Sequence, residues 1–306
     1  MAGIAVVLYG VVAVLVVGLA WARAKRPEPL RVDGRAVVAL QAARRRSLSA
    51  IGLALALLAA GIATAQLAPG WLGVGAALAP ALAGVGGLTL YAAIPPIQDT
   101  GVQTRYAASL ARRTPWSVAP RAALALLGTA ILLLLALLVF TGATSSPDER
   151  GRFRAITFTS PLSSSTATPY PGWFYAVPLI LGTVLLALAV WAALLRIATT
   201  ASFPGEGLEA LDSKWRSSSA RIIVGLATAA VCLQLGGVAL FAGTTMGTAR
   251  FQPGVSAGWE ILATGLTLFG TASLLLSVVA LTLAALRAFA LPKRVARSGA
   301  EARRPA

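Results

Sequence analysis

Several long stretches of this chain contain no charged residue. Residues 222–249 form one of them, directly after a short segment that holds two arginines and three serines, Trp215–Arg221. A helix that crosses a hydrocarbon core about 30 Å thick needs about 20 apolar residues. Over the whole chain 57% of the residues are hydrophobic and 12% are charged, whereas about a quarter are charged in ordinary globular proteins. The sequence therefore predicts an all-α, polytopic transmembrane helical bundle.

The apolar stretches divide into seven predicted spans. Pro69-Gly70 is a strong turn signal, so the long apolar run around it is split into a tight hairpin. We expect a single seven-helix membrane domain over residues 1–292 and a basic disordered tail over 293–306. The predicted spans are Ile4–Ala22, Ala50–Leu67, Trp71–Ile94, Ala122–Thr141, Phe174–Leu195, Ile222–Phe241 and Trp259–Leu286, with inner connections 23–49, 95–121 and 196–221 and an outer loop 142–173.

The basic residues predict the orientation of the bundle. Of the 26 lysines and arginines, 22 lie in the three inner connections or in the C-terminal segment from Arg287 onward. Cytoplasmic loops carry the excess of Lys and Arg, and seven spans place all four segments on one side. The predicted topology has the N-terminus outside and the C-terminus in the cytoplasm. Residues 1–9 carry no charged side chain, so the first span reads as a retained reverse signal-anchor rather than a cleaved signal peptide.

The net charge of +16 is a feature of nucleic-acid-binding proteins as well. Here the arginines lie at the ends of apolar runs, where anionic lipid headgroups are the nearest partners. Arginine greatly outnumbers lysine, and Ala, Gly, Leu and Val dominate, as is typical of a GC-rich bacterial genome. We therefore expect a multi-pass protein of a bacterial plasma (inner) membrane, with anionic lipids and not nucleic acid as partners.

A short pattern recurs before three of the predicted spans: an arginine, a hydroxyl residue, one or two others, a serine and a small apolar residue. It occurs at Arg46–Ala50, Arg113–Val118 and Arg216–Ala220. One interpretation is convergent interface chemistry, in which Ser or Thr caps a helix and arginine anchors at the headgroups. The other is that three diverged helical hairpins, with a seventh span added, make up the domain.

Each inner connection also contains a predicted amphipathic helix in the membrane interface. Such helices either anchor the protein or dock a cytoplasmic partner. Glu206, Glu209 and Asp212 form the only acidic cluster on the inner side, so they are the candidate contact for a cytoplasmic ATPase or another membrane subunit. The three amphipathic segments are 32–46, 103–113 and 205–216.

Two polar residues lie inside predicted spans. Gln234 precedes Gly236-Gly237, where close helix packing is the simpler interpretation and a broken helix at a substrate gap is the alternative. Gln234 is expected to make an interhelical hydrogen bond. Glu260 is the one carboxylate within a span, at the outer end of the last helix, where it either complements the helix dipole or has a functional role.

The outer loop is rich in Ser, Thr and Pro, a composition that does not bury enough apolar surface to fold alone. Within it, Phe153–Thr159 alternates apolar and polar residues as a short strand does, and Asp148–Arg152 is predicted to be a charged turn. Aromatic residues at the outer ends of spans predict an interfacial belt. These residues are Trp71, Tyr170, Trp173, Phe174, Tyr175 and Trp259.

Missing residue types exclude most chemistries. The chain has no histidine and a single cysteine, Cys232, so imidazole metal sites, Ser-His catalysis and thiol pairs are excluded. No Walker-type Gly-Lys motif is present, so ATP-driven work needs a second polypeptide. We expect no cofactor and no enzymatic activity. The leading hypothesis is the membrane-embedded subunit of a multi-component transport or export system, and the alternative is an accessory, assembly or sensory protein that acts by lateral helix contacts.

Overall fold

The computed structural model describes residues 34–94, 114–160, 163–200, 209–249 and 257–290. Six of the described helices are long and apolar enough to span a membrane. The predicted first span, Ile4–Ala22, lies outside the described residues. The elements are α2 (Gly34–Leu67), η1 (Pro69–Trp71), α3 (Val74–Ala93), α4 (Pro115–Val118), α5 (Arg121–Ala143), β1 (Ser146–Pro147), β2 (Phe153–Ser160), β3 (Ser163–Ala167), α6 (Trp173–Thr199), α7 (Glu209–Ala249) and α8 (Ala257–Ala290).

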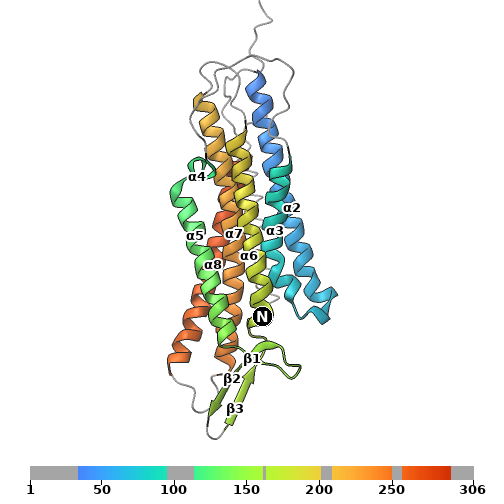
Figure 1. Ribbon diagram of the computed structural model, residues 1–306, viewed down its shortest axis with the longest axis vertical. Coiled ribbons are helices and arrows are strands. Elements are labelled where there is room, and N and C mark those ends of the chain that lie inside the picture. Colours follow the sequence, from blue (N-terminus) through green and yellow to red (C-terminus); the bar gives the residue numbers. More distant parts are fainter. Residues whose placement is uncertain (1–33, 95–113, 161–162, 201–208, 250–256, 291–306) are drawn as a thin grey trace, which may run out of the picture.

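The six long helices form an elongated bundle with the small sheet at one end (Figure 1). We call the end with the sheet the outer end. The opposite end, where α2 and α7 begin and α3 and α6 end, is the inner end. The predicted topology would place the inner end in the cytoplasm.

Helix α7 forms the centre of the bundle and packs against α3, α5, α6 and α8. Of its most apolar 18-residue stretch 83% is buried, against 22% for α5 and 33% for α8. The helices at the periphery of the bundle instead expose large aliphatic side chains, among them Leu132 of α5 and Leu268 of α8. A surface of this kind is stable when lipid is the solvent, so the burial pattern agrees with a multi-pass membrane protein.

Small residues let α7 and α8 approach closely. A Cβ on Gly236 would come within 2.9 Å of the Gly270 carbonyl oxygen, and one on Gly243 within 2.7 Å of the Ala263 carbonyl oxygen. Helix α7 continues without a break through Gly236-Gly237. The packing interpretation is confirmed for Gly236, whereas a Cβ on Gly237 would meet nothing within 4 Å, and the alternative of a broken helix there is wrong.

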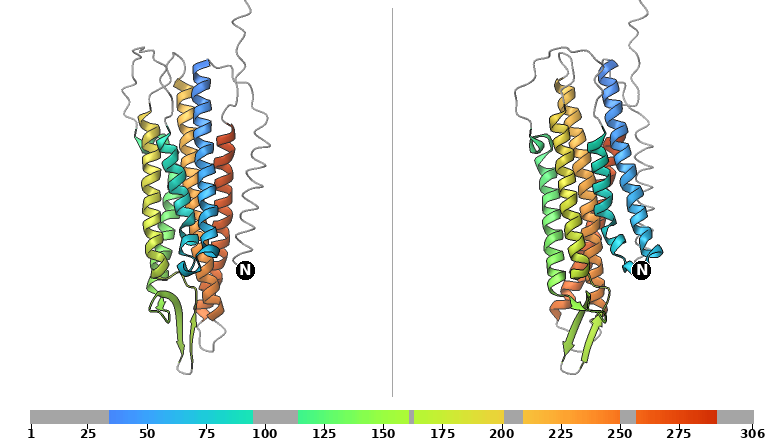
Figure 2. Two further views of the ribbon diagram at one scale, coloured as in Figure 1. Left: turned by 90° about the vertical axis from the view of Figure 1, so that its right-hand side faces the viewer. Right: turned by 45° about the vertical axis from the view of Figure 1, so that its right-hand side comes forward.

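The predicted hairpin at Pro69-Gly70 is confirmed, with η1 between α2 and α3. Gly73 begins α3 from a left-handed conformation, with φ of 82°, which glycine adopts without steric cost. Along the hairpin the two helices touch through small residues, and a Cβ on Gly61 would lie within 2.4 Å of the Ala79 Cβ. The two helices lie side by side in both views of Figure 2.

Two of the predicted interfacial helices are instead continuous with spans. Helix α2 has 34 residues and α7 has 41, which correspond to about 51 and 61 Å at 1.5 Å per residue. Both exceed a hydrocarbon core of about 30 Å, and both extend beyond the bundle at the inner end (Figures 1 and 2). The described parts of segments 32–46 and 205–216 therefore lengthen spans, whereas 103–113 lies outside the described residues.

The outer loop folds into a three-stranded antiparallel sheet in the order β1-β2-β3. The predicted strand over Phe153–Thr159 is confirmed as β2, which pairs with β3 from Ile156 opposite Ala167 onward. The Ser-rich and Thr-rich outer loop folds because it packs on the helices. Its residues Ile156 and Tyr170 form an apolar cluster with residues of α7 and α8. The belt prediction is wrong for Tyr170, which is fully buried, whereas Trp71 is exposed as expected.

Candidate functional site at the inner end

Arg46, on α2, is buried between helices. Only 1% of it is exposed. Its Nε donates a hydrogen bond to the carbonyl oxygen of Tyr91 in the last turn of α3, and its guanidinium carbon lies 3.9 Å from the centre of the Tyr91 ring. Its Nη1 and Nη2 are buried, and in the part of the chain that the structure describes they have no hydrogen-bond partner. The prediction that this arginine anchors at the headgroups is wrong, because α3 covers it.

Arg216, on α7, is buried in the same manner but is fully bonded. Its Nε donates to Asp212 Oδ2 at 2.8 Å and its Nη2 to Asp212 Oδ1 at 3.1 Å. Its guanidinium also donates to two carbonyls at the end of α6, those of Ile197 and, at 2.8 Å, Thr200. The headgroup prediction is therefore wrong here as well, and Arg216 forms an ion pair inside the protein.

The two arginines of the recurring pattern share one structural role. Each extends from the N-terminal part of a long helix to carbonyl groups at the C-terminus of a neighbouring helix. The last four carbonyls of a helix lack the usual partner within it, so each arginine supplies a donor to them, although the Ile197 carbonyl also accepts from the Thr200 amide. The residue four positions before the arginine differs between the two sites. It is Asp212 for Arg216 and Ala42 for Arg46.

The serines of the pattern do not cap α2 or α7, because both helices run through them. Ser47 donates to the Ala43 carbonyl within its own helix at 2.9 Å, whereas the buried Ser219 hydroxyl has no hydrogen-bond partner. The capping prediction is confirmed only for the copy at Arg113–Val118. There the Thr114 side chain accepts from the Ser117 amide at 3.3 Å and opens the short helix α4.

Two more hydroxyls and one more cation surround Arg46. The Tyr91 hydroxyl lies near that of Ser219, but neither makes a well-formed hydrogen bond with any described residue. Arg196, which is exposed in the last turn of α6, is close enough for its charge to repel that of Arg46. Donors from α2, α3 and α7 thus meet at a point where the described residues supply no carboxylate. Such an arrangement suits an anion.

The residues of the predicted docking cluster are placed differently from one another. Glu206 lies outside the described residues. Glu209 is the first residue of α7, and only its backbone is described. Asp212 is buried, with 5% of it exposed, and its carboxylate accepts both bonds from Arg216. The sequence signal that would have revealed this pair is the i, i+4 spacing of Asp212 and Arg216.

The two intramembrane polar residues lie apart. Gln234 is buried, and its Nε2 is 3.4 Å from the Leu179 carbonyl of α6, which is the interhelical bond expected from the sequence. Its Oε1 has no partner. Glu260 is exposed in the first turn of α8, at the outer end. The structure does not bring these two residues together.

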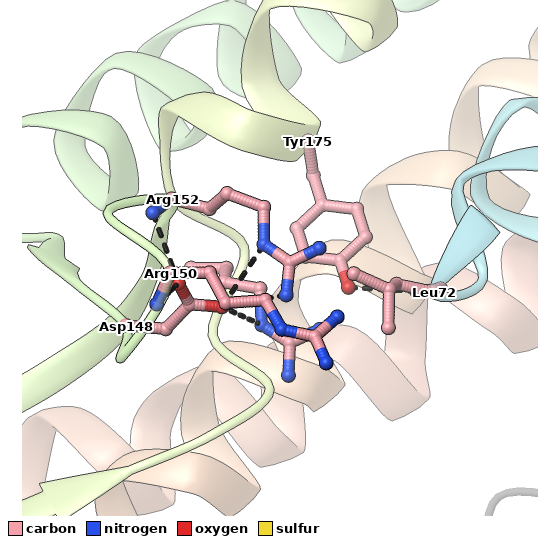
Figure 3. Close-up of polar contacts among 6 residues, drawn as sticks. Leu72, Asp148, Arg150, Arg152 and Tyr175 are labelled. Carbon is pink, nitrogen blue, oxygen red and sulfur yellow. Dashed lines mark hydrogen bonds and ion pairs between the residues drawn. The ribbon is translucent and has the colours of Figure 1, made fainter. Parts of the chain in front are cut away.

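A second charged cluster lies on the sheet, at the predicted charged turn (Figure 3). The Asp148 carboxylate accepts from the backbone amides of Arg150 and Arg152, each at 2.9 Å. It also pairs with the side chains of Arg152 at 3.1 Å and Arg154 at 3.0 Å. The hydrogen bond from the Arg152 amide is the main reason that the pKa of Asp148 lies below its ordinary value. This turn is confirmed, and its charges are largely balanced.

Two tyrosines join the sheet and its flanks to the helices. Tyr175, in the first turn of α6, donates from its hydroxyl to the Leu72 carbonyl at 2.7 Å (Figure 3). The Tyr170 hydroxyl lies 2.7 Å from that of Thr144, next to α5. Burial raises the pKa of Tyr170 to about 12, so it stays protonated at physiological pH. The Tyr170 bond holds the segment after β3 against the end of α5, and the Tyr175 bond joins α6 to the connection between α2 and α3.

The part of the chain that the structure describes holds no metal centre. It contains no group of three His, Cys, Asp or Glu side chains that could hold a metal ion. A recess of about 30 Å³ between α2, α3, α7 and α8 is lined by apolar residues such as Leu58, Ala83 and Leu226. The chain matches no protein-family model, and no curated protein or solved structure is similar to it.

Proposed function

We propose that this protein is the membrane-embedded, non-enzymatic subunit of a multi-component transport or export assembly in a bacterial plasma membrane. The six apolar helices support the membrane location. The composition supports a bacterial source, and the absence of a Walker-type motif in the sequence means that ATP-driven work would come from a second polypeptide. The part of the protein that would receive that partner is the inner end.

The observation that carries this proposal is the way in which the helices extend past the bundle. At the inner end Leu40 and Ala43 of α2 form a common apolar cluster with Trp215 of α7 and Ala288 of α8. We call this cluster the inner extension. Because it is packed and continuous with three spans, it offers a partner a rigid surface. The exposed residues around it are polar or basic, among them Arg45, Ser213 and Lys214.

Purification in a mild detergent tests the proposal. We expect a second polypeptide to co-purify in a fixed ratio. A photo-crosslinking residue in place of Lys214 should attach to that polypeptide. The same residue in place of Thr248, which is exposed near the outer end of the same helix, is the matched control and should not attach to it. Isolation of the chain alone, with no partner in a fixed ratio, would contradict the proposal.

The orientation is tested separately with a cysteine-free background, Cys232→Ser. A single cysteine at Ser213, exposed on α7, should react with a membrane-impermeant maleimide only after cells are permeabilised. A cysteine at Thr166, exposed on β3, should react in intact cells. The reverse pattern would place the inner extension outside the cytoplasm, and the proposed cytoplasmic docking would be rejected.

A second candidate is an accessory or assembly protein that moves no solute itself. It is favoured by the close packing of the described bundle, in which α7 is largely buried and the recess beside it is small and apolar. Reconstitution distinguishes the two. Loss of solute flux from an assembly that forms normally without this chain supports the subunit role. Loss of the assembly itself, with unchanged flux per assembled complex, supports the accessory role.

A further inference from the structure

We propose that the inner end holds a binding site for a phosphate-bearing anion, formed by Arg46 of α2, Tyr91 of α3 and Ser219 of α7. The anion is either the headgroup of an anionic phospholipid or free phosphate, which share the chemistry that these residues recognise. The site is independent of the proposed transport function, because it requires no protein partner.

The first argument is the unused half of the Arg46 guanidinium. Nε is bonded to the Tyr91 carbonyl, but Nη1 and Nη2 are buried and have no acceptor among the residues that the structure describes. A buried charge without a partner is costly, and native structures pair such groups. The Tyr91 ring covers a face of the guanidinium at 3.9 Å. Its nitrogens therefore remain available to an acceptor in the guanidinium plane.

The second argument is the comparable site in the same chain. At Arg216 the acceptor is the Asp212 carboxylate, which takes bonds of 2.8 and 3.1 Å from two nitrogens of one guanidinium. Arg46 has Ala42 at the equivalent position. A phosphate presents a similar pair of oxygens, and arginine binds both groups in the same bidentate geometry. An external anion would therefore give Arg46 what Arg216 obtains from its own helix.

The third argument is the set of groups next to Arg46. The hydroxyls of Tyr91 and Ser219 are buried and lie near each other, and within the described residues neither makes a well-formed hydrogen bond. Each hydroxyl can donate one hydrogen bond to a phosphate oxygen. Arg196 also lies close by, and its positive charge adds to that of Arg46. An anion with several oxygens satisfies all of these groups at once.

The depth of the site fits a phospholipid as the source. Tyr91 lies in the last turn of α3 and Arg196 in the last turn of α6. The ends of spans lie at the level of lipid headgroups, and basic pockets between transmembrane helices on the cytoplasmic side bind anionic headgroups. The Arg46 nitrogens are shielded from solvent, so the anion enters by displacing the side chains that cover them.

The test uses the full-length protein purified in detergent, as wild type, Arg46→Gln and Arg45→Gln. Arg45 is exposed on the same helix, so the control variant loses the same charge without affecting the site. In one arm native mass spectrometry measures retention of added phosphatidylglycerol against phosphatidylcholine. In the other arm the thermal midpoint is compared in inorganic phosphate and in chloride at equal ionic strength.

We expect wild type and Arg45→Gln to retain one phosphatidylglycerol that Arg46→Gln binds at least about tenfold more weakly, the loss expected when hydrogen bonds to a charged group are removed. A phosphate-dependent stabilisation of wild type that Arg46→Gln lacks, without lipid retention, would assign free phosphate instead. Ser219→Ala, a smaller change, should weaken binding a few-fold and keeps the test valid if Arg46→Gln does not fold. The proposal is overturned if neither ligand distinguishes these site variants from wild type. Water or a carboxylate of a protein partner would then satisfy Arg46.

Discussion

Arg46 and Arg216 occupy equivalent places in the recurring pattern but differ in how their charge is balanced. Both are buried at the inner end and both donate to carbonyls at the C-terminus of a neighbouring helix. Arg216 is held by the carboxylate of Asp212, whereas two nitrogens of Arg46 have no partner among the described residues. One residue, four positions before the arginine, accounts for the difference. The comparison teaches that an arginine that donates to the C-terminal carbonyls of a neighbouring helix can pair with a carboxylate of its own helix or lack one. We call Arg216 with Asp212 the closed pair and Arg46 the open site.

The largest effect is expected when the closed pair is broken. Arg216→Met removes the cation that pairs with the buried Asp212 carboxylate and a donor to the Ile197 carbonyl, so it should lower the free energy of unfolding by about 3–5 kcal/mol. Denaturant titration in detergent micelles measures this loss. The double variant Arg216→Met/Asp212→Leu should recover much of the stability. A double variant as unstable as the single one would show that the carboxylate is not the cause.

The same substitution at the open site should have a smaller effect. Arg46→Met removes one hydrogen bond and the contact with the Tyr91 ring, but it also removes the cost of burying a charge that has no counterion. In detergent free of phospholipid and phosphate we expect a loss of no more than about 1 kcal/mol. A loss as large as that of Arg216→Met under these conditions would mean that Arg46 is already paired.

An engineered carboxylate should convert the open site into the closed one. In Ala42→Asp the new side chain lies four residues before Arg46, as Asp212 does before Arg216. We expect a gain of about 1 kcal/mol in the free energy of unfolding and a loss of phosphatidylglycerol retention. Ala42→Asn is the control, because it has similar volume without the charge. Retention that is unchanged in Ala42→Asp would break the equivalence between the two sites.

The smallest effect is expected at the partly buried charges beside the sheet. The pKa of Asp148 is lowered in the folded protein, mainly by the bond from the Arg152 amide. Its stabilising contribution is therefore present above the ordinary pKa of 3.8 and is lost as the pH falls through the lower folded value. Asp148→Asn should remove this pH dependence, and at neutral pH it should lower stability slightly because that contribution is lost. Thermal midpoints of both proteins across acidic pH measure the difference.

The sequence predicted the membrane class and the six described spans because hydropathy depends on local composition alone. It also predicted the hairpin at Pro69-Gly70, the charged turn and strand β2, since turn residues and alternation are local signals. The burial of Arg46 and Arg216 was not predictable in this way. An arginine just before an apolar run has the same local pattern whether it faces headgroups or a neighbouring helix. Only the packing of α3 on α2, and of α6 on α7, decides between these cases.

The fold of the outer loop shows the same limit. Its Ser-rich and Thr-rich composition correctly indicated that it has too little apolar surface for a core of its own. The missing apolar partners are supplied by α7 and α8, in particular by Ala242, Met246 and Ala263. Contacts between segments so far apart in the chain leave no local trace in the sequence. Tyr170 was therefore assigned to the lipid interface although it is the centre of this contact.

Helix α7 is bonded at both of its ends, and this limits how the protein can move. Near the outer end Thr245 donates to the Pro169 carbonyl at 2.6 Å, and at the inner end Arg216 donates to the last carbonyls of α6. Between these points α7 has no break. A displacement of the sheet along the axis of α7 would therefore be transmitted through this helix to the opposite face of the bilayer, unless one of these hydrogen bonds breaks first.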